Sequence, residues 1–164
     1  ANGGSIRYYI SNKNSLYKTN YIKISTILKE EKIFKLEEIS TYKKFLKNID
    51  NEKVKLNNFL NQKIKQKMII HGYGASTKGN VLLQFCGLTT KEIPYIAEVN
   101  EEKFGAYTPG SLIPIISEEE AKSMKPDYFL VLPWHFKENI LKREKEYIAN
   151  GGKFIFPLPE IEIV

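Results

Sequence analysis

The residue types best suited to bind a ligand lie between Met68 and Asn80, where an apolar run leads into a Gly-x-Gly turn and a second apolar run follows. The glycines allow a sharp turn and close approach of a ligand to the backbone. A helix that starts directly after such a turn presents N–H groups suited to phosphate. The turn alone leaves two interpretations open, a phosphate-binding turn or a plain strand-to-helix connection. Thr77 stands where a full dinucleotide fingerprint has its third glycine, and the P-loop pattern is absent. The candidate ligand-binding residues of this stretch are Gly72, Tyr73, Gly74, Ala75, Ser76, Thr77 and Lys78.

Four further residues lie just after two later apolar runs. They are candidates because ligands of parallel sheets bind beyond the carboxyl ends of the strands. Glu98 and Asn100 end one run, and an acid in such a place often holds a ribose hydroxyl. Trp134 and His135 follow another. Trp134 is able to stack on a base or sugar or to cover the core, and His135 to exchange a proton with a ligand or to serve the structure alone.

No catalytic constellation is complete in this sequence. It contains no Ser/His/Asp set at a recognisable spacing, no cluster of metal-ligand spacing and no evident acid/base carboxylate pair. Catalytic residues therefore stay unassigned and no metal site is expected. The remaining histidine, His71, lies late in an apolar run and Cys86 lies inside an apolar helix, so both are expected to be packed.

Composition narrows the class of protein. The 164 residues suit one domain with a short extension, and 42% hydrophobic residues can build a core. Residues 1–67 carry 15 Lys or Arg against 6 Asp or Glu, but the lysines are scattered among Glu and Asn, so no nucleic-acid partner is expected. A single cysteine favours a cytoplasmic protein, and without an apolar run of roughly 20 residues no membrane partner is expected.

Hydrophobic periodicity predicts the elements that position the candidates. Residues 6–10 favour a strand, residues 22–34 a short helix, and residues 36–64 a long amphipathic helix with a possible break at 48–51. From Met68 onward strands alternate with helices. The predicted fold is therefore α/β, a Rossmann-like doubly wound parallel sheet preceded by a long amphipathic helix. The later strands are expected at 93–99, 113–115, 128–132 and 153–156, and the later helices from Glu118 and over 136–149.

Six segments together resemble one family, the C-terminal domain of S-adenosylmethionine-dependent sugar C-methyltransferases. The likeness covers nearly the whole chain and depends on the number, order and spacing of the motifs rather than on any one of them. The segments are Gly3–Tyr9, His71–Asn80, Asn100–Gly110, Ile113–Ile115, Leu132–Phe136 and Gly151–Ile155.

The resemblance implies a domain organisation and a task. Residues 1–20 would end a preceding methyl-donor domain and its linker, 21–66 would form a helical connector, and 67–164 the Rossmann-like C-terminal domain. S-adenosylmethionine would be bound by the methyl-donor domain, and zinc by an N-terminal region, both upstream of Ala1. The implied reaction deprotonates a carbon beside a keto group and methylates it. This chain would hold a nucleotide-linked deoxysugar against the methyl-donor domain and would be inactive alone.

Two other classes remain open at this stage. One is a stand-alone dinucleotide-binding domain, such as an oxidoreductase fragment or a ligand-sensing module. The other is a helical oligomerisation module that uses residues 36–65.

Overall fold

The computed structural model describes residues 6–164, which form two compact units, one ending at Asp50 and one running from Asn51 to Val164. The predicted organisation into 1–20, 21–66 and 67–164 stays a prediction. None of the helices in residues 6–164 is long and apolar enough to cross a membrane.

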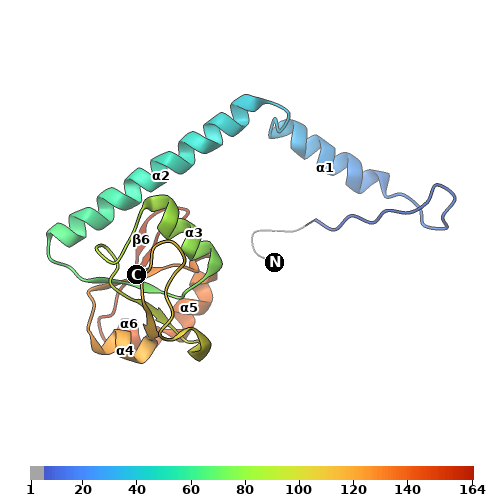
Figure 1. The fold of residues 1–164 in the computed structure, drawn as a ribbon. Helices are drawn as coiled ribbons and strands as arrows, with labels where there is room; N and C mark the ends of the chain where they lie inside the picture. The colour runs from blue at the N-terminus through green and yellow to red at the C-terminus, as the bar shows by residue number, and fades with distance from the viewer. Residues whose placement is uncertain (1–5) are drawn as a thin grey trace. The chain divides into compact units, whose positions relative to one another are not determined.

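The first unit carries α1 (Tyr21–Ile33) and the first half of α2 (Ile39–Lys65), as Figure 1 shows. Asn20 caps α1 by accepting a hydrogen bond from the amide of Lys23. The possible break near residue 50 is wrong, because α2 is continuous. The strand predicted at 6–10 is also wrong: these residues form no regular element and have no paired neighbour within residues 6–164, and the earlier part of that segment lies outside the described residues.

The second unit is built on a six-stranded sheet of order β3-β2-β1-β4-β5-β6. All neighbouring strands are parallel except β5 and β6, which are antiparallel. This is a doubly wound order, in which the chain runs outward in one direction from β1 and in the other from β4. The predicted fold class is thereby confirmed. The strands are β1 (Ile70–Tyr73), β2 (Ile96–Glu98), β3 (Ile115–Ser117), β4 (Tyr128–Val131), β5 (Phe154–Phe156) and β6 (Glu162–Ile163).

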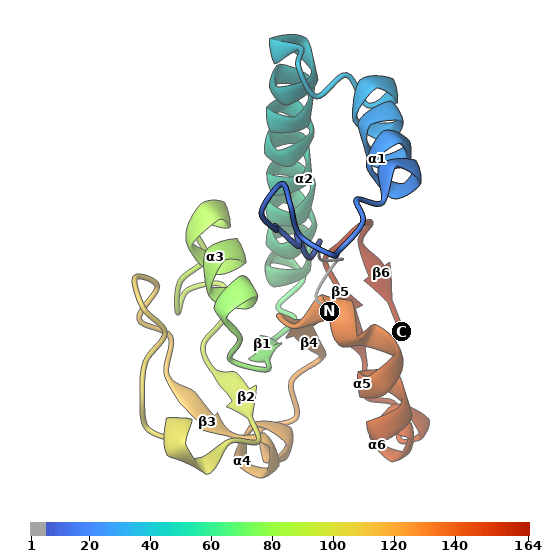
Figure 2. The ribbon, with the colours of Figure 1, turned by 90° about the vertical axis from the view of Figure 1, so that its right-hand side faces the viewer.

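Helices cover both faces of the sheet (Figure 2). The side chains of β4 alternate between these two faces and pack against the helices on each. Leu130 joins a core cluster with Leu56 and Leu60 of α2, whereas Phe129 joins a cluster on the other face with Ile140. Alternate side chains of a strand point to opposite faces, so a strand buried on both faces is apolar throughout. The helices of this unit, beside the second half of α2, are α3 (Thr77–Cys86), α4 (Glu118–Ser123), α5 (Lys137–Arg143) and α6 (Lys145–Ala149).

Local sequence sets the helix ends that matter for the site. Ser76 caps α3 by accepting a 3.0 Å hydrogen bond from the amide of Gly79. Ser117 caps α4 in the same way by accepting a hydrogen bond from the amide of Glu120. The single helix predicted over 136–149 is divided at Glu144 into α5 and α6.

Candidate functional site

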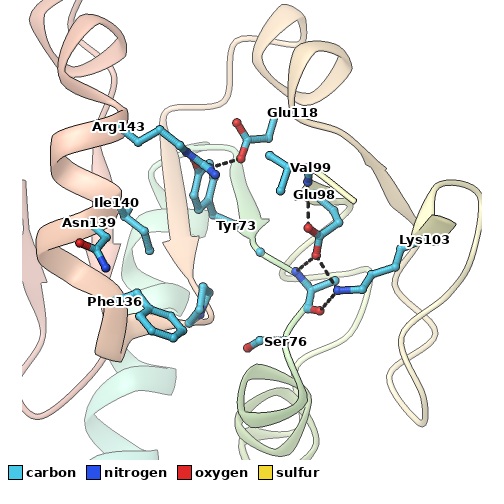
Figure 3. A pocket seen from close by; sticks show the side chains of 13 residues that line it. Tyr73, Ser76, Glu98, Val99, Lys103, Glu118, Phe136, Asn139, Ile140 and Arg143 are labelled. Atoms are coloured by element: carbon cyan, nitrogen blue, oxygen red, sulfur yellow. Dashed lines mark hydrogen bonds and ion pairs between the residues drawn. The ribbon is translucent and has the colours of Figure 1, made fainter. Parts of the chain in front are cut away.

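A pocket of about 420 Å³ lies at the carboxyl edge of the sheet, between the ends of β1, β2 and β4. The strand order reverses between β1 and β4, and this is where open α/β sheets bind their ligands. Figure 3 shows Phe136, Asn139, Ile140 and Arg143 on one side of the pocket and Glu98 and Lys103 on the other. The full lining consists of Tyr73, Gly74, Ala75, Ser76, Glu98, Val99, Lys103, Glu118, Pro133, Phe136, Asn139, Ile140 and Arg143.

The glycine turn forms one edge of this pocket, and its shape depends on Gly74. This residue has φ +80°, and a Cβ there would lie 2.8 Å from the ring of Pro133. The turn that follows β1 is therefore packed directly against the one that follows β4. Only a glycine gives both the positive φ and the close approach.

The carboxylate of Glu98 is held by the backbone of two loops. Its Oε2 accepts hydrogen bonds from the amide of Ala75 at 2.9 Å and from the ammonium of Lys103 at 3.1 Å. Its Oε1 accepts from the amides of Val99 at 2.8 Å and Asn100 at 3.1 Å. Burial alone would raise the pKa of Glu98, but the bonds from Asn100, Lys103 and Val99 hold that pKa below its usual value. Glu98 is thus an ionised part of the scaffold.

A second ionic network lies on the opposite side of the pocket and ties β1 to α4 and α5. The Tyr73 hydroxyl donates to Glu144 at 2.7 Å, and Arg143 donates to Tyr73, to Glu118 and, through Nε at 3.0 Å, to Glu144. Lys122 closes the network with a 2.6 Å bond to Glu144. Burial, followed by the hydrogen bond to Glu144, raises the pKa of Tyr73 far above its usual value, so the phenol stays protonated.

The pocket brings together five of the residues proposed from sequence, namely Tyr73, Gly74, Ala75, Ser76 and Glu98. The other six lie outside its lining. Gly72 is buried within β1, Thr77 and Lys78 are exposed on the first turn of α3, and Asn100 caps a 3₁₀ turn through the amide of Glu102. Trp134 packs on the apolar core, and His135 is exposed, with a pKa lowered by its slight burial and then by the charge of Lys78. Of the two alternatives open for Trp134, the structure therefore has the cover of the core.

Sequence reasoning missed eight residues of the lining. Glu118 could have been predicted as a lining residue, because it directly follows β3. It was missed because that strand runs over Ile115–Ser117 rather than the predicted 113–115. Phe136 was passed over for its neighbour Trp134, although Phe136 is the one that lines the pocket and is 47% exposed. Of the remaining six, Lys103 and Pro133 lie in segments that carry the family resemblance, whereas Val99, Asn139, Ile140 and Arg143 belong to no motif.

No metal centre is formed by the described part of the chain. Among residues 6–164 the structure holds no group of three His, Cys, Asp or Glu side chains arranged to bind a metal ion. The buried polar groups of the pocket are instead paired with one another.

Comparison with known proteins defines the class. The model of the C-methyltransferase C-terminal domain family matches residues 1–159, and the chain belongs to this family. It is also 36% identical over 141 residues to the C-methyltransferase NovU of Streptomyces niveus. That match covers 86% of this chain and 34% of NovU, so the chain spans about a third of the length of that relative. The family identified from the sequence is thereby confirmed.

Proposed function

We propose that this chain is the substrate-binding, C-terminal domain of an S-adenosylmethionine-dependent sugar C-methyltransferase, and that its substrate is a nucleotide-linked deoxysugar. The observation that carries the proposal is the pocket at the reversal of strand order, in a domain whose family is defined by C-methyl transfer. Its volume lies in the range of pockets that enclose small ligands. Its role is to bind and orient the acceptor for a methyl group delivered from elsewhere.

The methyl donor does not fit this pocket. A donor nucleoside bound at a Rossmann-type turn needs an acid at the end of the second strand to accept bonds from its ribose hydroxyls. Glu98 occupies that position, yet each of its two carboxylate oxygens already accepts two hydrogen bonds from within the chain. The same observation speaks against the alternative of a dinucleotide-binding oxidoreductase domain. We therefore assign the donor site to another part of the full protein.

Binding to the isolated chain tests the proposal. The ¹⁵N-labelled 164-residue chain is titrated with a TDP-linked deoxysugar and, in parallel, with NADH, and backbone amide shifts are followed. The proposal expects the nucleotide-sugar to shift resonances around the pocket and NADH to leave them unchanged. Shifts with NADH alone would transfer the chain to the dinucleotide-binding class.

A pair of matched variants locates the ligand. Phe136→Ala removes an exposed ring from the pocket, whereas Phe85→Ala removes a 38% exposed ring from α3, outside the lining. The first is expected to weaken nucleotide-sugar binding by about tenfold, or roughly 1.4 kcal/mol. The second should leave the affinity within about twofold of the original value. Equal losses in both variants would place the ligand elsewhere.

A further inference from the structure

The first unit of the chain has no core of its own. None of residues 6–50 is buried, and the second unit holds every buried residue among residues 6–164. Isolated helices shorter than about 12–15 residues are marginal in water, and helices in proteins gain most of their stability from packing. The 13-residue helix α1 and the first half of α2 therefore lack the packing that would keep them folded.

Large apolar side chains are nevertheless concentrated in this first unit. Among residues 6–164, more of the exposed large apolar side chains lie in it than in the second unit, which is more than twice as long. They include Tyr9 at 84% exposed, Ile22 on α1 at 79% and Ile39 on α2 at 72%. Soluble proteins rarely leave so much apolar surface uncovered, and such a concentration marks a site of interaction.

Part of this surface is one side of the helix α2. Apolar side chains at spacings of three and four follow this side along the helix, interrupted at Lys53, and they are Ile39, Tyr42, Leu46, Ile49, Leu56 and Leu60. Leu56 and Leu60, on the second half of the helix, are buried in a core cluster, whereas Ile39 and Leu46, on the first half, are exposed. The same side of α2 is thus covered in its second half and uncovered in its first.

The extent of the apolar surface indicates what kind of partner covers it. A second copy of the chain would pair the uncovered side of α2 with itself, because pairing of two helices buries a single stripe on each. The apolar side chains of α1 and of residues 6–17 would then stay exposed. A folded domain, in contrast, is large enough to cover two helices and the segment that precedes them.

The comparison with known proteins indicates which domain is available. The matched family model includes residues 6–50, so the uncovered unit belongs to the C-methyltransferase C-terminal domain itself. The match with NovU leaves about two thirds of that relative outside it. The proposed function assigns the methyl-donor site to such a part of the full protein.

We propose that residues 6–50 are the docking surface for the methyl-donor part of the full protein, and that they fold against that part rather than on their own. The inference rests on the proposed function, since that function supplies the donor part. Docking of this unit ties the part that carries the methyl group to the chain that binds its acceptor.

Amide hydrogen exchange, measured by mass spectrometry on the 164-residue chain and on the full protein, tests the inference, and sedimentation velocity gives the oligomeric state of the 164-residue chain. That chain is expected to be monomeric, with the amides of residues 21–48 exchanging within about tenfold of an unstructured peptide and those of residues 56–64 protected. In the full protein, exchange over residues 21–48 should slow at least about a hundredfold. Protection of residues 21–48 in a monomer of the 164-residue chain would mean that the unit folds unaided, and protection in a dimer that a second copy covers it. Either result, or unchanged exchange in the full protein, would overturn the inference.

Two variants of α2 locate the surface. Leu46→Asp places a charge on the uncovered apolar side, and Asn51→Asp places the same charge on the opposite, exposed side of the helix. In the full protein the first should speed exchange over residues 21–48 at least about tenfold, and the second should leave it within about twofold. In the 164-residue chain neither should move the urea midpoint of the second unit, because both positions are exposed there. Equal exchange in the two variants of the full protein would overturn the inference. The proposed function is judged separately, by the nucleotide-sugar titration, so its failure and that of the docking surface are distinguishable.

Discussion

The backbone amide of Ala75 donates a 2.9 Å hydrogen bond to the carboxylate of Glu98, 23 residues further along the chain. This bond joins the turn after β1 to the end of β2. Lys103 bridges the same two segments, with Nζ at 3.0 Å from the carbonyl of Ala75 and 3.1 Å from the carboxylate. One acid thus fixes the edge of the pocket at which a related sheet would hold a nucleotide.

The first prediction concerns stability at this joint. Glu98→Ala leaves the amide of Ala75 and the ammonium of Lys103 without their acceptor in a part-buried position, and should lower the free energy of unfolding by about 2–4 kcal/mol. Urea denaturation followed by circular dichroism measures the change. The control is Glu102→Ala, an exposed acid expected to cost less than about 0.5 kcal/mol. Similar midpoints for the two variants would mean that the carboxylate does not hold the turn.

The second prediction separates backbone strain from close packing at the glycines. Gly74 and Gly87 have φ values of +80° and +71°, so alanine at either position carries a strain of roughly 1–2 kcal/mol. At Gly87 a Cβ meets nothing within 4 Å, whereas at Gly74 it lies 2.8 Å from the Pro133 ring. Gly74→Ala should therefore cost at least about 1 kcal/mol more than Gly87→Ala in urea unfolding. A difference near zero would show that the Pro133 loop moves aside freely.

The alternation of strands and helices after Met68 was predictable because the buried strands are short apolar runs and the helices between them have apolar residues at helical spacing. Tyr128–Val131 is buried on both faces and is apolar throughout, as a central parallel strand must be. Residues 6–10 gave a false strand, because β-branched and aromatic side chains favour extended backbone whether or not a neighbour exists to pair with. Strand β6 was missed because two exposed residues, Glu162 and Ile163, carry no pattern.

The pocket was predictable only in part, for a similar reason. The glycine turn and Glu98 were found because they lie at strand ends, and strand ends can be located from hydrophobic runs. Arg143 lies at the end of a helix and reaches the pocket through its length, in contact with Tyr73, which is 70 positions earlier in the chain. Such a contact depends on how the helix packs and leaves no signal in local spacing. The internal use of Glu98 is equally a tertiary fact, since its partners belong to two loops.

The third prediction concerns the network around Glu144. Burial alone would raise its pKa, but the bonds from Lys122, Tyr73 and Arg143 hold that pKa below the ordinary value of 4.5. A carboxylate with a lowered folded-state pKa contributes stability that is present above the unfolded value and is lost as the pH falls through the folded value. Glu144→Gln should cost about 1–3 kcal/mol at pH 7 and flatten the fall in stability below about pH 4.5.

The matched control for this network is Glu146→Gln, an exposed acid two residues away on α6. It should change the free energy of unfolding at pH 7 by less than about 0.5 kcal/mol and leave the acid limb of the profile as it is. Urea midpoints between pH 7 and 3.5 compare the three proteins. If the urea midpoint of Glu144→Gln falls with pH in parallel with that of the original protein, the Glu144 carboxylate does not contribute to the loss of stability in acid.

The last prediction concerns His71, which is 2% exposed and packs edge-on against Tyr95 and Phe129 with ring centroids 5.5 and 6.2 Å away. Its Nδ1 is buried and has no hydrogen-bond partner within residues 6–164, and burial lowers its pKa below 6.5. The unfolded chain therefore takes up a proton at this position before the folded chain does. Stability from neutral His71 is fully present above about pH 6.5 and declines as the pH falls below it, by at most ~1.4 kcal/mol per pH unit.

His71→Phe fills the same aromatic site without a titrating group, so its urea midpoint should change less than that of the original protein between pH 7.5 and 5.5. The pKa of exposed His135 is also lowered, so His135→Gln should flatten the curve as well, but less than His71→Phe because the burial at His135 is slight. Should the His71→Phe variant lose stability over this interval as steeply as the unaltered chain, the acid sensitivity arises from another group.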